Sequence, residues 1–179
     1  MAAKKKYDFT EVLISREQLA DKVAELGAKI SEDYKGEELF LIGILKGSVP
    51  FMADLMLAIT LDVEMDFMSV SSYGSGTKTS GVVRILKDLD SDIAGKNVLI
   101  VEDIIDSGLT LAYLKEYLAK RNPKSIKIVT MLSKPARRKA DIEADYTGFV
   151  VDDKFIVGYG LDIDQKYRNL PYISWIRED

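Results

Sequence analysis

The sequence predicts a single α/β domain with a doubly wound, twisted and mainly parallel sheet that is flanked by helices. Residues 39–45 and 98–101 are short apolar runs without polar alternation, which is typical of strands buried on both faces of a parallel sheet. Residues 109–120 have helical spacing, and a strand pattern at 125–131 completes a βαβ unit. With 179 residues, of which 47% are hydrophobic, the chain is long enough to bury one core.

A short strand and a long helix are expected at the start of the chain. Residues 7–14 have a strand pattern, and Ser15 and Gln18 have the spacing of a capping box, in which each side chain bonds to the backbone of the other residue. Apolar residues at helical spacing then continue to about Tyr34, before Gly36. This pattern predicts a helix that packs one apolar face against the sheet.

The next elements continue the alternation of strands and helices. After the strand at 39–45, Pro50 suits the first turn of a helix that reaches about Ile59. Apolar residues alternate with acids at 63–67, which indicates a third strand with one polar face.

Residues 71–81, SSYGSGTKTSG, are nearly all small, polar or glycine, and they predict a mobile loop. Residues 82–87 have the pattern of a returning strand, so the loop is expected to cross the open side of the domain as a lid. The composition fits a disordered hairpin tip equally well.

Residues 98–110, VLIVEDIIDSGLT, contain the candidate active site. Glu102 and Asp103 follow the strand, and Asp106 and Gly108 precede the helix. Free backbone N–H groups at a helix start attract phosphate, and glycine permits close approach of the backbone. The acids suit sugar hydroxyls or a magnesium ion, which prefers oxygen ligands. The segment therefore predicts a phosphorylated sugar with a metal.

An isolated Asp-Ser-Gly tripeptide would more simply be a turn that caps a helix, with its acid an ordinary loop carboxylate. The whole string favours a functional site, because three acids crowded against an apolar strand repel one another.

Composition excludes several classes of chemistry. The chain has no cysteine and no histidine, which excludes thiol nucleophiles, disulfides, zinc–thiolate sites and imidazole catalysis. A net charge of −4 argues against a nucleic-acid surface. No apolar run approaches the ~20 residues of a membrane span, and the start MAAKKK lacks the apolar core of a signal peptide. We therefore expect a cytoplasmic protein without nucleic-acid or membrane partners.

The string VLIVEDIIDSGLT resembles the phosphoribosyl diphosphate signature of type I phosphoribosyltransferases. ILKGSVPFMADL, SSYGSGT, LSKPARR and DDKFIVGYGLDIDQKYRNLPYI occur in the order seen in the hypoxanthine-guanine branch of that family. The resemblance covers nearly the whole chain beyond the first helix. It implies one domain with a core at about 36–150, a small hood from about 1–15 and 151–179, and a flexible loop over the site. The segment after Met131 is loop-rich and charged, and it cannot be another regular βα repeat.

The resemblance implies a role for each matched position. The residues implied to bind 5-phosphoribosyl 1-diphosphate are Lys46, Gly47, Ser72, Tyr73, Glu102, Asp103, Asp106, Ser107, Gly108, Leu109, Thr110 and Arg168. The residues implied to bind the purine are Lys134, Phe155, Ile156 and Asp162. The residues implied to hold Mg²⁺ are Glu102, Asp103 and Asp162. Asp106 is implied to be the general base at purine N7, and the Lys46-Gly47 loop is implied to hold pyrophosphate, often through a strained cis peptide.

The implied reaction converts hypoxanthine or guanine and 5-phosphoribosyl 1-diphosphate to IMP or GMP and pyrophosphate, in a homodimer or homotetramer. Taken singly, Lys134 and Arg168 would be solvated surface charges and Phe155 a core aromatic residue. Arg137 and Arg138 are interpreted as surface or interface residues.

Two alternatives belong to other functional classes. A regulatory protein of the same fold that binds nucleotides or RNA would need a basic face, whereas this chain is acidic. A magnesium-dependent phosphatase or receiver-like domain would use the acids after the strand, but it leaves residues 155–162 unexplained.

Overall fold

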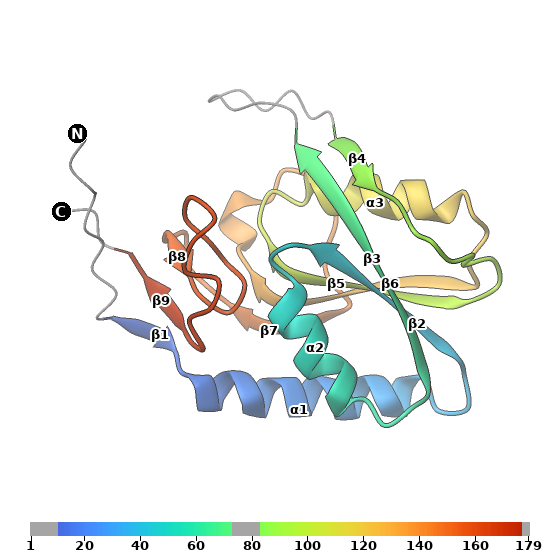
Figure 1. Ribbon diagram of the computed structural model, residues 1–179, viewed down its shortest axis with the longest axis horizontal. Coiled ribbons are helices and arrows are strands. Elements are labelled where there is room, and N and C mark those ends of the chain that lie inside the picture. The colour runs from blue at the N-terminus through green and yellow to red at the C-terminus, as the bar shows by residue number, and fades with distance from the viewer. Residues whose placement is uncertain (1–10, 73–82, 177–179) are drawn as a thin grey trace.

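The computed structural model describes residues 11–72 and 83–176, which form two sheets and three α-helices (Figure 1). The large sheet has the order β4-β3-β2-β5-β6-β7. Its strands are β2 (Leu39–Leu45), β3 (Val63–Ser72), β4 (Val83–Lys87), β5 (Asn97–Ile105), β6 (Ser125–Ser133) and β7 (Tyr146–Val150). The helices are α1 (Arg16–Asp33), α2 (Val49–Ala58) and α3 (Leu109–Ala119), together with the short 3₁₀ helix η1 (Pro135–Arg137). The predicted α/β class is confirmed.

The large sheet is parallel except at one edge, where β4 runs antiparallel to β3. In the centre, β2 and β5 pair from Leu39 with Asn97 to Gly43 with Val101. Because parallel strands end at the same edge of a sheet, this register brings the chain after β2 close to the acids at the end of β5.

The apolar strands are buried on both faces, as their uniform composition predicts. Leu39 and Leu41 of β2 join a core with α1 and α2, whereas Phe40 and Ile42 join a second core with α3. Figure 1 shows α1 below the sheet and α3 above it. Helices therefore cover both faces, which leaves the carboxyl edge of the strands open for a site.

Most predicted elements are confirmed, including the capping box of Ser15 and Gln18. The structure differs in three main places. β3 continues beyond the predicted strand at 63–67 to Ser72, so that it includes the first two residues of the predicted loop at 71–81. β5 continues beyond the apolar run to Ile105, so that Glu102 and Asp103 lie within the strand. The segment after Met131 also adds β7, parallel to β6, through a connection that contains η1 and no α-helix. The absence of a βα repeat was predicted correctly, but the sixth strand was not expected.

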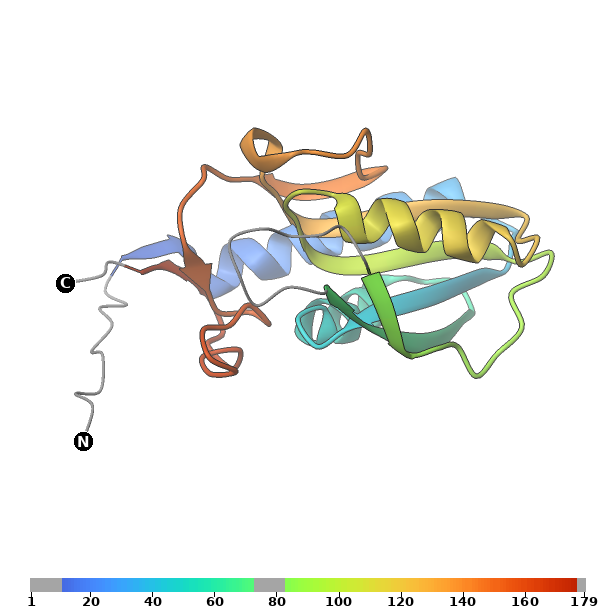
Figure 2. The same ribbon diagram turned by 90° about the horizontal axis from the view of Figure 1, so that it is seen from above.

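A small antiparallel sheet lies at one end of the large sheet (Figure 2). It is formed by β1 (Val12–Ile14), β9 (Ile173–Trp175) and β8 (Ile156–Val157), in that order. No helix in the described part of the chain is long and apolar enough to cross a membrane. Tyr73 and most of the predicted lid at 71–81 lie outside the described residues, while Ser72 is the last residue of β3.

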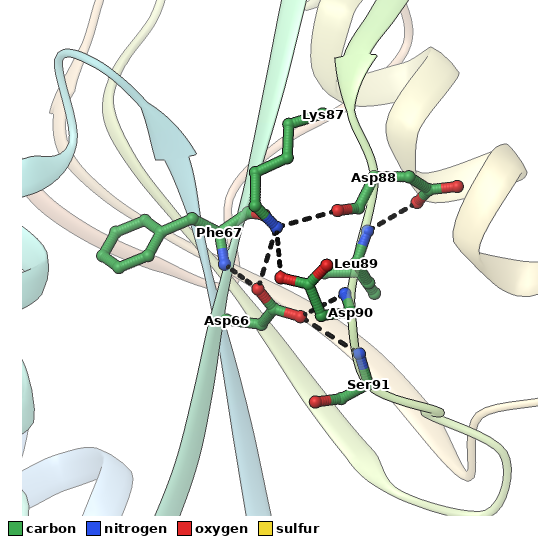
Figure 3. Close-up of polar contacts among 7 residues, drawn as sticks. All are labelled: Asp66, Phe67, Lys87, Asp88, Leu89, Asp90 and Ser91. Atoms are coloured by element: carbon green, nitrogen blue, oxygen red, sulfur yellow. Dashed lines mark hydrogen bonds and ion pairs between the residues drawn. The ribbon is translucent and has the colours of Figure 1, made fainter.

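A buried carboxylate joins β3 to β4 and to the chain that follows it (Figure 3). Oδ1 of Asp66 accepts hydrogen bonds from the N–H of Phe67 at 2.6 Å and from Nζ of Lys87 at 3.3 Å. Oδ2 accepts from the N–H groups of Asp90 at 2.7 Å and Ser91 at 3.2 Å. Asp66 is 9% exposed, so these donors replace its hydration and hold the base of the β3–β4 hairpin together.

Candidate active site

Glu102 and Asp103 form an enclosed pair of acids in the last part of β5. Burial raises the pKa of Glu102 well above its usual value, and the neighbouring charge of Asp103 raises it further. Burial also raises the pKa of Asp103 to about 6, although the N–H of Ile104, Glu102 and the charge of Arg168 act in the opposite direction. Two adjacent acids in this setting favour a cationic or hydroxyl-bearing ligand, because either would relieve the repulsion between them.

The loop after β2 packs directly against this pair. A methyl group added at Gly47 would lie 1.7 Å from Oδ2 of Asp103, so only glycine fits there. Gly160, with a φ of 100°, packs against Gly47 in turn, and a methyl group added at Gly160 would lie 1.8 Å from the carbonyl oxygen of Gly47. The peptide bond between Leu45 and Lys46 is cis, directly before the Lys46-Gly47 pair for which a cis peptide was expected.

Cationic side chains converge beside these close contacts. Nζ of Lys46 donates to Oε1 of Gln165 at 3.4 Å, and Arg168 donates to the same oxygen at 3.3 Å. Arg168 also donates to the carbonyl oxygen of Gly160 at 2.7 Å and forms an ion pair of 2.7 Å with Asp162. Lys46 and Arg168, which come from distant parts of the sequence, therefore share one polar cluster that suits a phosphate-rich ligand.

The loop at 106–108 connects β5 to α3, and it forms the first part of the phosphate loop predicted at 106–110. The N–H of Lys134 donates to the carbonyl oxygen of Ile105, at the end of β5, and the N–H of Lys139 donates to that of Ser107, each at 2.9 Å. Gly108, with a φ of 77°, precedes the first turn of α3, whose N–H groups have no partner within the helix. A cavity of about 100 Å³ is lined by Glu102, Ile104, Ile105, Asp106, Ser107, Gly108, Thr110 and Leu111.

The interpretation of Arg138 as a surface or interface residue is wrong. Its side chain is 10% exposed, and it donates to the carbonyl oxygens of Ile105 and Asp106 and to Oγ of Ser133. Glu143 binds the same guanidinium at 3.1 Å. Arg138 therefore braces the phosphate loop from within the fold, and five donors in one planar group explain why an arginine occupies this position.

Lys134 and Asp106 belong to one charge cluster at the end of the sheet. Lys134 is only 6% exposed, and burial lowers its pKa, while Asp106 and Asp153 raise it and Arg137 lowers it. Arg137 pairs with Asp106 at 3.1 Å and with Asp153 at 2.9 Å. Lys134 is therefore not the solvated surface charge that it would be if it were considered alone.

Residues 154–156 complete the surroundings of Lys134. Nζ of Lys134 donates to the carbonyl oxygen of Lys154 at 2.6 Å. Phe155 is 57% exposed, so it is not a core aromatic residue, whereas Ile156 is buried in β8. An exposed aromatic ring next to a buried cation can stack on a flat heterocycle whose polar edge the cation reads.

The structure brings together most of the predicted site residues, but not all of them. Among the described residues, no group of three acids is placed to hold a metal ion, so Asp162 does not join Glu102 and Asp103. Sequence reasoning missed Gln165, Arg138 and Asp153. All three lie inside the quoted motifs, but no residue pattern signalled their contacts.

Comparison with known proteins then decides the family. The family model described as "Phosphoribosyl transferase domain" matches residues 13–164, which is most of the chain. The chain belongs to this family. As a phosphoribosyltransferase, it shares 56% identity with the hypoxanthine-guanine phosphoribosyltransferase of Bacillus subtilis over 172 residues, which cover 96% of each protein.

Solved structures agree with this assignment. A hypoxanthine phosphoribosyltransferase from Staphylococcus aureus matches this phosphoribosyltransferase with a TM-score of 0.92 at 50% identity, covering 95% of this chain and 92% of the other. A hypoxanthine-guanine phosphoribosyltransferase from Bacillus anthracis matches with a TM-score of 0.90 at 50% identity, covering 96% and 99%. The resemblance predicted from the motifs is confirmed.

Proposed function

We propose that this phosphoribosyltransferase is a purine salvage enzyme that transfers the phosphoribosyl group of 5-phosphoribosyl 1-diphosphate to hypoxanthine or guanine. The products are IMP or GMP and pyrophosphate. The observation that carries the proposal is the cluster of Lys134, Asp106 and exposed Phe155, which together offer a cation, a carboxylate and an aromatic face to one flat base. The names and close similarity of the relatives point to the same substrates.

The phosphoribosyl group is assigned to the other half of the site. The 5-phosphate binds to residues 106–110 at the start of α3, and pyrophosphate binds between the Lys46-Gly47 loop and Arg168. The small cavity at the phosphate loop and the Lys46–Gln165–Arg168 contacts support these positions. Glu102 and Asp103 hold the ribose hydroxyls.

The acid pair also fits magnesium. Mg²⁺ is commonly held by one or two carboxylates, with the remaining positions taken by water and substrate phosphates. Glu102 and Asp103 are donors of this kind, and burial followed by the charge of Asp103 raises the pKa of Glu102. Asp162, which is paired with Arg168, would reach the metal only by leaving that partner. When bound, Mg²⁺ would neutralise charge on the pyrophosphate leaving group.

The residues then act on the charges that develop during transfer. The bond between C1 of ribose and the pyrophosphate oxygen breaks, and its electron pair leaves with pyrophosphate, which Lys46 and Arg168 stabilise. The bond from purine N9 to C1 forms as the sugar gains oxocarbenium character. Asp106 accepts the proton from N7 of the base, and Lys134 binds O6. Phe155 stacks on the ring, and the backbone of Ile156 contacts its edge.

An absorbance assay tests this function. We expect the protein, 5-phosphoribosyl 1-diphosphate and Mg²⁺ to produce the spectral change of nucleotide formation with hypoxanthine or guanine, and not with adenine. EDTA should abolish turnover and added Mg²⁺ should restore it.

Asp106→Asn should lower kcat by about 10²–10⁴-fold, the range typical of a general base, with little change in the KM for 5-phosphoribosyl 1-diphosphate. Nucleotide binding without turnover would instead identify a regulatory protein.

A further inference from the structure

Arg137 links the candidate base to the purine-binding segment, although the proposed reaction assigns it no role. One of its terminal nitrogens lies 3.1 Å from Oδ2 of Asp106, and its Nε lies 2.9 Å from Oδ1 of Asp153. Asp106 belongs to the loop after β5, whereas Asp153 precedes β8, so the three residues connect the two halves of the site. An arginine is suited to this bridge, because its rigid fork can meet two carboxylates at once.

The two oxygens of Asp106 differ in their surroundings. Oδ2 is engaged by Arg137, whereas Oδ1 is buried and has no hydrogen-bond partner within the part of the chain that the structure describes. Oδ1 therefore faces the protein, although the Asp106 side chain as a whole is 41% exposed, and Oδ2 is the oxygen that a ligand can reach. Because a carboxylate oxygen can accept more than one hydrogen bond, the Arg137 contact leaves Oδ2 able to accept another and fixes the direction in which it does so.

We infer that Arg137 is a positioning residue that holds the Asp106 carboxylate through Oδ2 and so directs this oxygen toward the N7 proton of the purine. Asp153 holds Arg137 in turn, which gives an Asp153–Arg137–Asp106 chain across the mouth of the purine site. This inference rests on the proposed role of Asp106 as the base. Arg137 itself does not contact the reacting atoms.

The position of Lys134 agrees with this assignment. The charges of Asp106, Arg137 and Asp153 all act on the pKa of Lys134. The three linked side chains therefore lie close to the residue that is proposed to bind O6. A purine bound between Asp106 and Lys134 would place its N7 and O6 edge against these charged side chains. Misplacing a catalytic group by about 1 Å can cost about 10²-fold in rate, so orientation of one carboxylate is a sufficient reason for an arginine here.

The test is steady-state kinetics of purified variants with hypoxanthine. Arg137→Gln should lower kcat by about 10- to 100-fold while changing the KM for 5-phosphoribosyl 1-diphosphate by less than about twofold. Arg137→Lys keeps the charge but lacks the fork, and it should recover only part of the loss. Asp153→Asn should lower kcat in the same direction by a smaller factor. Lys139→Gln, which removes an exposed charge two residues away, is the matched control and should retain kcat within about twofold.

The double variant separates positioning from general damage. If Arg137 acts through Asp106, adding Arg137→Gln to Asp106→Asn should cause no further loss. Independent losses that multiply would overturn the inference, as would an Arg137→Gln enzyme with normal kcat or a Lys139→Gln enzyme equally impaired.

If Asp106→Asn itself retains full turnover, the proposed base is wrong. If Asp106→Asn is impaired but Arg137→Gln is normal, only the role of Arg137 is wrong. Because Arg137 is about half exposed, its variants should fold.

Discussion

Gly47 lies where three segments of the site meet, and a single side-chain atom would separate them. The position of an added methyl group coincides with the Asp103 carboxylate, and the carbonyl oxygen of Gly47 is in turn approached by Gly160. Three backbone or carboxylate groups therefore pack at distances that no other residue permits. The close packing of these segments therefore depends on the absence of a side chain at Gly47.

We predict that Gly47→Ala raises the KM for 5-phosphoribosyl 1-diphosphate by about 10²-fold, because either the loop or Asp103 must move. Gly36→Ala is the control, since its added methyl group meets nothing within 4 Å while its φ of 77° makes alanine unfavourable. The control should lose about 1 kcal/mol of stability without a change in KM. Steady-state kinetics and urea unfolding measure both quantities, and normal kinetics in Gly47→Ala would refute the packing explanation.

Among the elements, the β3–β4 hairpin depends on one buried charge. Burial raises the pKa of Asp66, but the N–H donors of Phe67, Asp90 and Ser91 and the Lys87 ammonium outweigh this and hold its pKa below the usual value for an aspartate. A carboxylate that binds protons less readily when folded stabilises the fold above its unfolded pKa, and this contribution is lost as the pH falls through the folded pKa.

We therefore predict that Asp66→Asn lowers the free energy of unfolding at pH 7 by about 1–3 kcal/mol, because hydrogen bonds to a charged acceptor are lost. The difference between the wild type and the variant should shrink as the pH falls below about 4. Urea unfolding between pH 3 and 7 measures this, with the exposed Asp62→Asn variant as the control. A difference that is constant over this range would show that the charge of Asp66 contributes nothing.

The predicted and observed bounds of the helices and strands show which parts of the fold the local sequence determines. β2 was predicted with its observed bounds and α1 and α3 to within one residue, because uniform apolar runs and helical spacing reflect burial that local sequence already determines. β7 was not predicted, since Tyr146–Val150 becomes a strand by adding to the edge of β6, a neighbour distant in sequence. Likewise, the acid string and Lys134 stood out in motifs, whereas the brace formed by Arg138 depends on contacts between separate segments.

At the scale of the whole molecule, the small sheet connects the purine-binding segment to the end of the chain. Ile156 of β8 pairs with Trp175 of β9, which also lies beside β1. The ammonium of Lys154 lies 4.1 Å from the centre of the Trp175 ring, while the carbonyl oxygen of Lys154 accepts a hydrogen bond from Lys134. A change at Lys134 can therefore reach the tryptophan through one intervening residue.

This arrangement predicts an optical signal for occupancy of the purine site. Trp175 is the single tryptophan of the chain, so its fluorescence reports on this sheet alone. If O6 of IMP binds Lys134 as proposed, it should draw Nζ of Lys134 away from the carbonyl oxygen of Lys154, and the cation–π contact of Lys154 with Trp175 should change as well. Titration with IMP should change the emission, whereas ribose 5-phosphate should leave it near its starting value, because it lacks a base. Lys154→Gln should remove most of the response, and equal responses to both ligands would contradict a path through Lys134.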